Sequence, residues 1–270
     1  MNTANMDLPV APRAPVSAPH RTHTFKLLLK REFWEHKGGM LWAPIVAAGI
    51  SLLLTLMAIV TFEIMIDRVP DHATINVDGG SFQINGLDLS MLTQKMSADE
   101  LVQWGGAIDV ASFLATLWPL IVLTFVVFFY CLGSLYDERK DRSVLFWKSL
   151  PLSDTSTVLS KVFSATLVAP TLAFVVGILS MLGFMILLSI LAVFHGGNPI
   201  ALVWGPSNPL TVAWKLIASI PIYALWALPT VGWLMLCSSW AKSKPFLWAI
   251  MIPVFAGIFV TWFDLMQLFN

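Results

Sequence analysis

The sequence predicts an all-α polytopic membrane protein that crosses the bilayer five times. Of the 270 residues, 57% are hydrophobic and only 12% are charged, whereas a soluble domain carries about 25% charged residues. The hydrophobic residues are concentrated in five long tracts, each sufficient to cross the hydrocarbon core as a helix. The loops between the tracts are alternately rich and poor in Lys and Arg, which is typical of membrane proteins with several spans.

The N-terminal region contains a proline-rich stretch followed by an amphipathic helix. Residues 1–23 have no helical period, so we expect a disordered cytoplasmic tail. Residues 24–37 (TFKLLLKREFWEHK) repeat apolar residues at helical spacing, with Thr24 as N-cap. A basic amphipathic helix before a span is typical of the membrane interface, and Gly38-Gly39 is expected to break it. The alternative is that these residues form the first turns of a long spanning helix. The interfacial prediction rests on Phe25, Lys26, Leu29, Lys30 and Phe33.

The transmembrane domain is predicted over residues 40–270. Each predicted span contains at least one proline, which neighbouring helices tolerate by satisfying the freed carbonyl groups. The third tract is long enough to tilt or to hold two helices, so six spans are the alternative count. We assign the spans to Met40–Ile66, Ile108–Leu135, Val158–Phe194, Trp214–Trp240 and Phe246–Phe269.

Two of the loops carry structural predictions. In the external loop, residues 67–107, apolar and polar residues alternate around Asp78-Gly79-Gly80, which predicts a β-hairpin. Ser97 follows as a helix start. In the cytoplasmic loop, residues 136–157, a charged run is followed by the apolar VLFWKSL, which predicts about two helical turns with Ser143 as N-cap. Ser153 or Asp154 is expected to cap the next helix.

The distribution of Lys and Arg sets the predicted orientation. Six precede the first span, four lie in the 136–157 loop and two in the 241–245 turn, whereas the 195–213 loop has none. The rich segments face the cytoplasm, so we expect a cytoplasmic N-terminus and an external 67–107 loop.

The sequence lacks the motifs of several chemistries. It contains no P-loop, no HExxH and no GxSxG, so we expect no catalytic, cofactor-binding or metal-binding residue. Lys and Arg together equal Asp and Glu, 16 of each, and no basic excess indicates nucleic acid. Cys131 and Cys237 are expected to be small core residues, and His195 a solvated loop residue. The ionisable residues of the spans lie near span ends, where we expect interfacial solvation: Glu63, Asp109, Lys215 and Asp264.

The stretch ERKDRSVLFWKSLPLS, Glu138 to Ser153, resembles the cytoplasmic loop of ABC-2 type permeases, the membrane subunits of bacterial ABC exporters. The shared pattern is an acidic–basic pair, a hydroxyl residue, several apolar residues and S-x-P. The similarity extends to Lys30–Glu32 and to the order of spans over residues 24–265. Arg142 stands where a glycine is common in the family.

The resemblance implies a non-catalytic permease subunit in the bacterial inner membrane. It implies a separate ABC ATPase that binds ATP and Mg²⁺, a homodimer or heterodimer of permeases, and a coupling helix that docks on the ATPase. Family members commonly have six spans, so five indicate a shorter member, an incomplete chain or two helices merged in the third tract. The residues expected to couple to the ATPase are Glu138, Arg139, Ser143, Val144, Leu145, Phe146, Trp147, Leu150 and Pro151.

Three alternatives stay open at this level. Residues 144–150 have enough apolar side chains to lie in the membrane surface as a short interfacial helix instead of docking on a protein. The whole chain is alternatively a stand-alone membrane immunity or scaffold protein that works without an ATPase. An intramembrane enzyme is a third class, which the lack of a convergent polar set disfavours.

Overall fold

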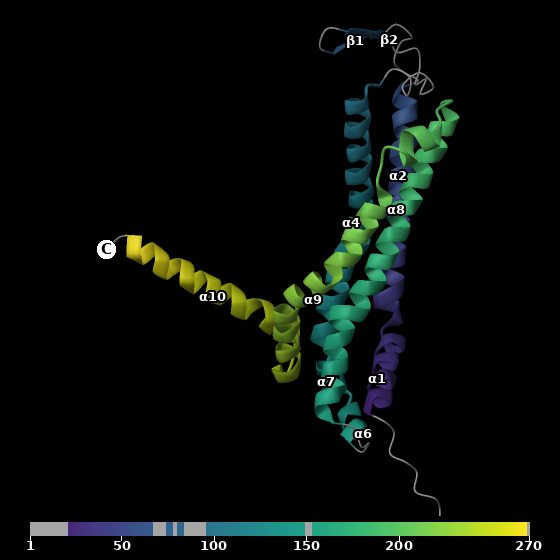
Figure 1. Cartoon of the computed structure of the whole chain (residues 1–270). Coiled ribbons are helices and arrows are strands. Elements are labelled where there is room, and N and C mark those ends of the chain that lie inside the picture. The colour runs from purple at the N-terminus through teal and green to yellow at the C-terminus, as the bar shows by residue number, and fades with distance from the viewer. Residues whose placement is uncertain (1–20, 67–73, 78–79, 84–95, 149–152, 269–270) are drawn as a thin grey trace, which may run out of the picture.

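The computed structural model describes residues 21–66, 74–77, 80–83, 96–148 and 153–268 (Figure 1). Its five long apolar helices confirm the predicted number and order of candidate spans, by length and composition. These helices cover Gly38–Met65, Ala98–Lys140, Asp154–Phe194, Pro209–Trp240 and Pro245–Gln267.

The N-terminal helix continues into the first candidate span, where the sequence predicts a break at Gly38-Gly39. α1 (Arg21–Glu35) passes through the π-helical segment η1 (Gly38–Trp42) into α2 (Ala43–Ile66), and α1 and α2 follow one line in Figure 1. The backbone N–H of Met40 donates to the carbonyl oxygen of His36 at 3.0 Å across this junction. The predicted break at Gly38-Gly39 is therefore wrong, because a π-turn widens the helix without interrupting its hydrogen bonds. Contact of α1 with lipid headgroups stays a prediction.

The start of α1 also differs from the prediction. The helix begins at Arg21, so Thr24 lies inside it and is not the N-cap. Residues 21–23 belong to this helix and not to the predicted tail, because no proline or glycine follows Pro19 to stop the helix there. The rest of the predicted tail, residues 1–20, lies outside the described residues.

α4 (Ala98–Ser134) is the central helix and packs against α2, α8 and α9. Its start confirms the helix start predicted at Ser97, because Ser97 and Glu100 form a capping box there. Ser97 Oγ accepts from the N–H of Glu100 at 3.3 Å, and Glu100 Oε2 accepts from the N–H of Ser97 at 2.7 Å. The helix begins well before the predicted span start at Ile108, so the end of the predicted 67–107 loop is helical.

The third candidate span, Asp154–Phe194, is one continuous helix. Ser153 caps α7 (Asp154–Phe163), as predicted, and accepts from the N–H of Ser156 at 3.2 Å. α7 continues through the π-helical segment η2 (Ser164–Val168) into α8 (Ala169–Phe194). The alternative of two merged spans is therefore wrong for this tract, because helical geometry runs through its middle and only one candidate span covers it.

The last two helices diverge. A short π-helix, η3 (Ile200–Trp204), leads to α9 (Pro209–Trp240), and α10 (Pro245–Leu268) leaves the bundle sideways in Figure 1. The contacts of α10 lie at its start, and its described residues 250–267 are exposed. The Phe246 ring lies 6.0 Å from that of Phe128 on α4, and the Trp248 ring lies 5.3 Å from that of Trp240 on α9.

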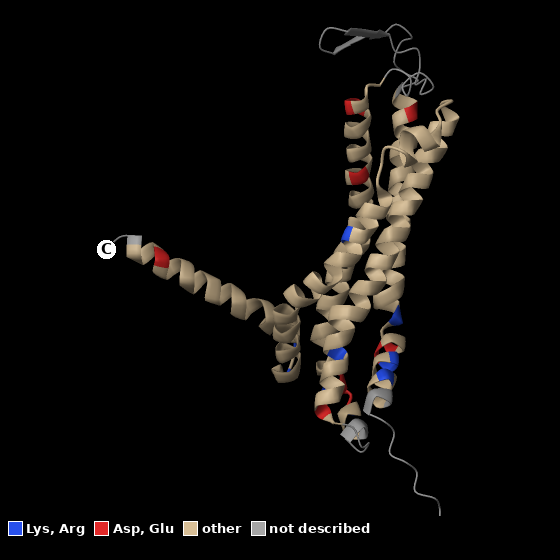
Figure 2. Cartoon of the chain, viewed as in Figure 1, with Lys and Arg blue, Asp and Glu red and all other residues tan. Residues whose placement is uncertain are grey.

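Two short strands, β1 (Thr74–Val77) and β2 (Gly80–Gln83), pair antiparallel with Val77 opposite Gly80. They lie where the sequence predicts the hairpin. The core lies where α4, η2 and α9 meet, and Cys131 and Cys237 are free and buried within it, as predicted. Charged residues gather at the two ends of the bundle, with most Lys and Arg around α1 and α7 (Figure 2).

Candidate functional site

The predicted coupling segment follows α4 as two short helices. α5 (Tyr136–Lys140) is followed by a turn at Asp141 and Arg142, and then by α6 (Ser143–Lys148). The prediction of a helix after the charged run is therefore confirmed, while its docking role stays a prediction. Ser143 is not the N-cap that the sequence predicts. It is the first residue of α6, and its hydroxyl donates back to the carbonyl oxygen of Glu138 at 3.2 Å.

Arg142 adopts a left-handed backbone conformation, with φ of 57°. This conformation places Cβ close to the following carbonyl oxygen, which glycine avoids. The position therefore favours glycine over a residue with a Cβ.

We expect Arg142→Gly to stabilise the folded chain by about 0.5–1 kcal/mol, because relief of the left-handed strain exceeds the added entropy of the unfolded chain. The measurement is the thermal unfolding midpoint of the purified protein in detergent. Arg142→Ala is the matched control, since it removes the guanidinium but keeps a Cβ. An equal increase for the alanine variant would attribute the effect to charge and contradict the backbone explanation.

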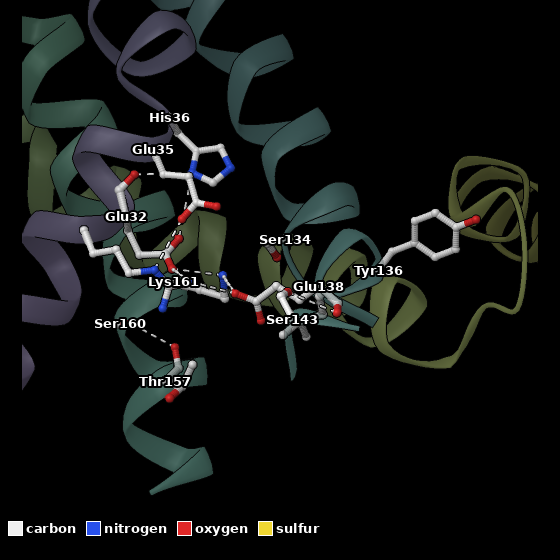
Figure 3. A network of polar contacts seen from close by, with 12 residues as sticks. Glu32, Glu35, His36, Ser134, Tyr136, Glu138, Ser143, Thr157, Ser160 and Lys161 are labelled. Atoms are coloured by element: carbon white, nitrogen blue, oxygen red, sulfur yellow. Dashed lines mark hydrogen bonds and ion pairs between the residues drawn. The ribbon is translucent and has the colours of Figure 1, made fainter. Parts of the chain in front are cut away.

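A cluster of buried ion pairs joins this segment to two other helices. Glu32 on α1 and Lys161 on α7 are each 1% exposed. Lys161 Nζ lies 3.0 Å from Glu32 Oε1 and 3.0 Å from Glu138 Oε1 on α5. Figure 3 shows the three side chains pointing toward one another. One ammonium group therefore holds carboxylates from two different helices.

Two more side chains complete this cluster, and a third packs against it. Arg31 Nη2 on α1 lies 2.9 Å from Glu138 Oε1 and 3.7 Å from Glu32 Oε1. The hydroxyl of Tyr130 on α4 donates to Glu32 Oε2 at 2.9 Å. The ring of His36 packs edge to face on Tyr130, with centroids 4.7 Å apart. We call Arg31, Glu32, Tyr130, Glu138 and Lys161 the ion-pair cluster.

Charge pairing in this cluster holds α1, α5 and α7 together. It contains two cations and two carboxylates, so its formal charges balance. Buried charges are stable only when they are paired, and removing one partner typically costs about 3–5 kcal/mol. α5 therefore cannot move away from α1 and α7 without breaking ion pairs. The cluster therefore ties α1, α5 and α7 together through paired charges.

A second set of contacts joins the same segment to α9. Arg139 Nη2 donates to the carbonyl oxygens of Ser238 at 2.7 Å and of Ala241 at 2.8 Å. These carbonyls belong to the C-terminal end of α9, where a cation is favourable. Ser238 Oγ accepts from the N–H of Tyr136 at 2.9 Å and donates to the Leu132 carbonyl oxygen at 2.7 Å. Residues 132–139 are thereby bound to α9 as well.

The predicted coupling residues fall into three groups. Glu138 and Arg139 make the ion pairs and hydrogen bonds described above. Ser143 and Val144 are half-buried and Leu145 is 68% exposed. The side chains of Phe146 and Trp147, and residues Leu150 and Pro151, lie outside the described residues.

The predicted face of the N-terminal helix packs on protein. The Phe25 ring lies 6.0 Å from that of Phe163, Leu29 and Phe33 are half-buried, and Lys26 and Lys30 are exposed. The face turned toward α7 also contains Glu32. The sequence analysis names Glu32 only within the family resemblance and does not predict it as a site residue, although an acid four residues from Leu28 on an apolar face indicates a buried partner.

The opposite end of the bundle corrects a further prediction. His195 is not a solvated loop residue, because its Nε2 lies 3.2 Å from Glu63 Oε2 and its Nδ1 lies 3.0 Å from the Leu191 carbonyl oxygen. Asp109 Oδ1 accepts from the N–H of Asn208 at 2.8 Å. Glu63 and Asp109 therefore bind protein groups, which the prediction of simple solvation did not include. Lys215 and Asp264 are exposed.

No protein-family model, curated protein or solved structure matches this chain. Its five apolar helices make it a candidate polytopic membrane protein. The further assignment of function therefore rests on its own residues, chiefly on the ion-pair cluster and on the α5–α6 segment that this cluster holds.

Proposed function

We propose that this chain is the membrane permease subunit of an ATP-driven ABC-2 type exporter in the bacterial inner membrane. It works with a separate ATPase that binds ATP and Mg²⁺, and with a second permease as a homodimer or heterodimer. The chain itself is not an enzyme. It passes the motion that ATP hydrolysis produces in the ATPase to its own membrane helices.

The observation that supports this proposal is the attachment of the α5–α6 segment to three helices at once. Glu138 pairs with Lys161 on α7 and with Arg31 on α1. Arg139, the next residue, holds the end of α9. A loop that only connected α4 to α7 would not need these attachments. A segment that receives force from a partner needs such attachments, because the force has to reach several spans together.

Under this proposal, α6 is the surface that touches the ATPase. It follows α5 through the tight turn at Arg142, so displacement of α6 pulls directly on Glu138 and Arg139. α5 continues α4 with little interruption, and α4 packs on α2, α8 and α9. A push on α6 therefore reaches the bundle through its central helix and through the ion-pair cluster.

The orientation belongs to the same proposal. The N-terminus and the α5–α6 segment face the cytoplasm, and the hairpin faces outside. This orientation agrees with the positive-inside rule, because most described Lys and Arg gather around α1 and α7 (Figure 2). ATP is cytoplasmic, so the ATPase has to dock at that end.

The test is capture of the ATPase by coupling-helix variants. Aromatic anchors at interface centres often contribute about 2 kcal/mol or more each, or about thirtyfold in affinity. Asp at Phe146 or Trp147 additionally buries an unpaired charge in the dock. We expect Phe146→Asp and Trp147→Asp to insert in the membrane but to lose the P-loop ATPase that co-purifies with the wild-type chain from native membranes. The measurement is ATP hydrolysis and mass spectrometry at equal permease loading.

Lys140→Ala and Asp141→Ala are the controls, because screened charges at an interface rim contribute only about 0–1 kcal/mol. Both controls should keep the ATPase. Its retention by both Asp variants contradicts the coupling assignment and favours a surface helix. The absence of any P-loop subunit from the wild-type preparation favours the stand-alone immunity or scaffold protein.

A further inference from the structure

A groove of about 560 Å³ lies between α1 and α4, beside the ion-pair cluster. We call it the α1–α4 groove. One wall consists of the end of α1 and the π-helical segment η1, and the other consists of α4 and the start of α5. Its volume lies within the range that holds drug-sized molecules, roughly 300–1,000 Å³. π-helical segments inside α-helices frequently occur at functional sites.

The groove combines aromatic rings with carboxylates. Phe125 and Phe129 line it and are 61% and 59% exposed. The Phe129 ring stacks on that of Phe246, with centroids 6.5 Å apart, so one of its faces is covered. The rings of His36 and Tyr130 also line it. Among the described lining residues, two are acidic and none is Lys or Arg; the acids are Glu35 and Asp137.

The two carboxylates differ in their surroundings. Glu35 Oε2 lies 3.3 Å from Arg31 Nε, so a cation already neutralises part of its charge. Within the described part of the chain, the Asp137 carboxylate has no hydrogen bond or ion pair with a side chain. It lies against Gly133, where an added Cβ would be 2.7 Å from Asp137 Oδ2. Lys37, on the same helical path as Glu35, does not line the groove, and its ammonium lies 5.1 Å from the Trp34 ring centroid.

We propose that the α1–α4 groove binds a lipophilic monovalent cation without a phosphate group. Exposed aromatic faces attract cations through their quadrupoles, and the Asp137 carboxylate supplies the matching charge. The groove crosses the start of the first candidate span, at Gly38. The apolar part of the groove therefore lies along the span, and its two carboxylates lie at the end of the span, at the level of the lipid headgroups. A phospholipid would place its phosphate near two carboxylates, so lipid is the disfavoured occupant.

A ligand in this groove contacts the coupling machinery directly. Tyr130, which lines the groove, donates to Glu32 in the ion-pair cluster. Asp137 is the neighbour of Glu138 in α5. A cation bound in the groove therefore lies beside the junction of α1, α4 and α5. The binding does not depend on the exporter proposal, whereas the role of the cation as exported substrate rests on it.

The test uses the full chain in phosphatidylcholine nanodiscs, with tetraphenylphosphonium as the probe and empty nanodiscs as the blank. Tetraphenylborate is the matched control, because it has the same shape and the opposite charge. We expect saturable binding of the cation by equilibrium dialysis and none of the anion above the blank. Equal binding of both ions, or binding of neither, overturns the proposal.

Two variants locate the site. Asp137→Asn is expected to weaken tetraphenylphosphonium binding about fivefold, the effect of one solvated charge at contact distance. Asp141→Asn removes the same charge four residues further along the chain, outside the groove, and should bind as the wild type does. Gly38→Leu should abolish binding, because a Cβ at Gly38 meets no heavy atom within 4 Å and the side chain occupies free groove space.

The outcomes separate the two proposals. Wild-type affinity in both Asp137→Asn and Gly38→Leu overturns the site. Loss of probe binding when the chain is reconstituted in phosphatidylethanolamine nanodiscs identifies a phospholipid as the occupant. That result overturns the proposal that the ligand has no phosphate group. Tetraphenylphosphonium binding by a chain that never captures an ATPase refutes the exporter and leaves the site intact, and the reverse result refutes only the site.

Discussion

Lys161→Ala is expected to destabilise the folded chain by about 3–5 kcal/mol, the typical cost of removing one partner from a buried ion pair. Lys161 is 1% exposed and holds both Glu32 and Glu138 at 3.0 Å. Without the ammonium, the Glu32 carboxylate keeps the Tyr130 hydroxyl at 2.9 Å but loses its close cation. Arg31 remains 3.7 Å from it, too far for a full hydrogen bond.

The measurement is the unfolding midpoint in detergent, which should fall by roughly 10 °C for a chain of this size. Lys26→Ala is the matched control, because Lys26 is an exposed lysine on α1 and its loss should change stability by less than about 0.5 kcal/mol. The double variant Glu32→Gln with Lys161→Met should recover most of the loss, since it removes the unpaired charge. Equal midpoints for Lys161→Ala and Lys26→Ala would show that the ion pair does not hold the helices together.

Gly105→Ala is expected to destabilise the chain by about 3 kcal/mol, at the upper end of the usual cost of overpacking. Gly105 lies on α4 and faces the turn before α9. A Cβ there would lie 2.1 Å from the carbonyl oxygen of Pro206 and 2.6 Å from its carbonyl carbon. Because the obstacle is backbone and not a flexible side chain, the whole turn has to shift. The shift also strains the hydrogen bond from Trp104 Nε1 to the Leu202 carbonyl oxygen, 2.8 Å long.

Gly106→Ala provides the control on the same helix. A Cβ at Gly106 meets no heavy atom within 4 Å, and alanine is favoured over glycine in a helix by about 0.5–1 kcal/mol. The unfolding midpoint should therefore rise for Gly106→Ala and fall for Gly105→Ala. Midpoints that move in the same direction for both variants would contradict the close approach of α4 to the turn.

Local patterns in the sequence predicted the elements well. Tract length alone located the five candidate spans, because a helix has to cover a fixed hydrocarbon thickness. Ser97 and Ser153 were correct N-caps, because such caps depend only on residues within one turn. The predictions failed at Gly38-Gly39 and at Thr24. Glycine spacing does not reveal that a π-turn preserves the hydrogen bonds, and a cap motif does not exclude an earlier start.

The candidate site was only half predictable. Glu138 and Arg139 were identified through the loop pattern, whereas Glu32, Tyr130 and Lys161 were not predicted as site residues. Each of these residues lies in a segment that its local pattern already explains. Glu32 lies in an amphipathic helix, Tyr130 in an apolar tract and Lys161 beside a loop rich in Lys and Arg. Their contacts join positions 98 and 129 residues apart in the chain, and no local rule reports a contact at that separation.

The sequence by itself determined that the chain is a helical membrane protein with five candidate spans, that helices begin after Ser97 and Ser153, and which loop resembles a coupling segment. These properties follow from composition, tract length and caps, which act within a few residues. Only the tertiary structure decided that α1 packs on α7, that one lysine holds carboxylates from α1 and α5, and that an acidic aromatic groove opens beside them. The physical reason is that burial and charge pairing depend on which helices meet, and a charge is stabilised or penalised only once its neighbours are in place.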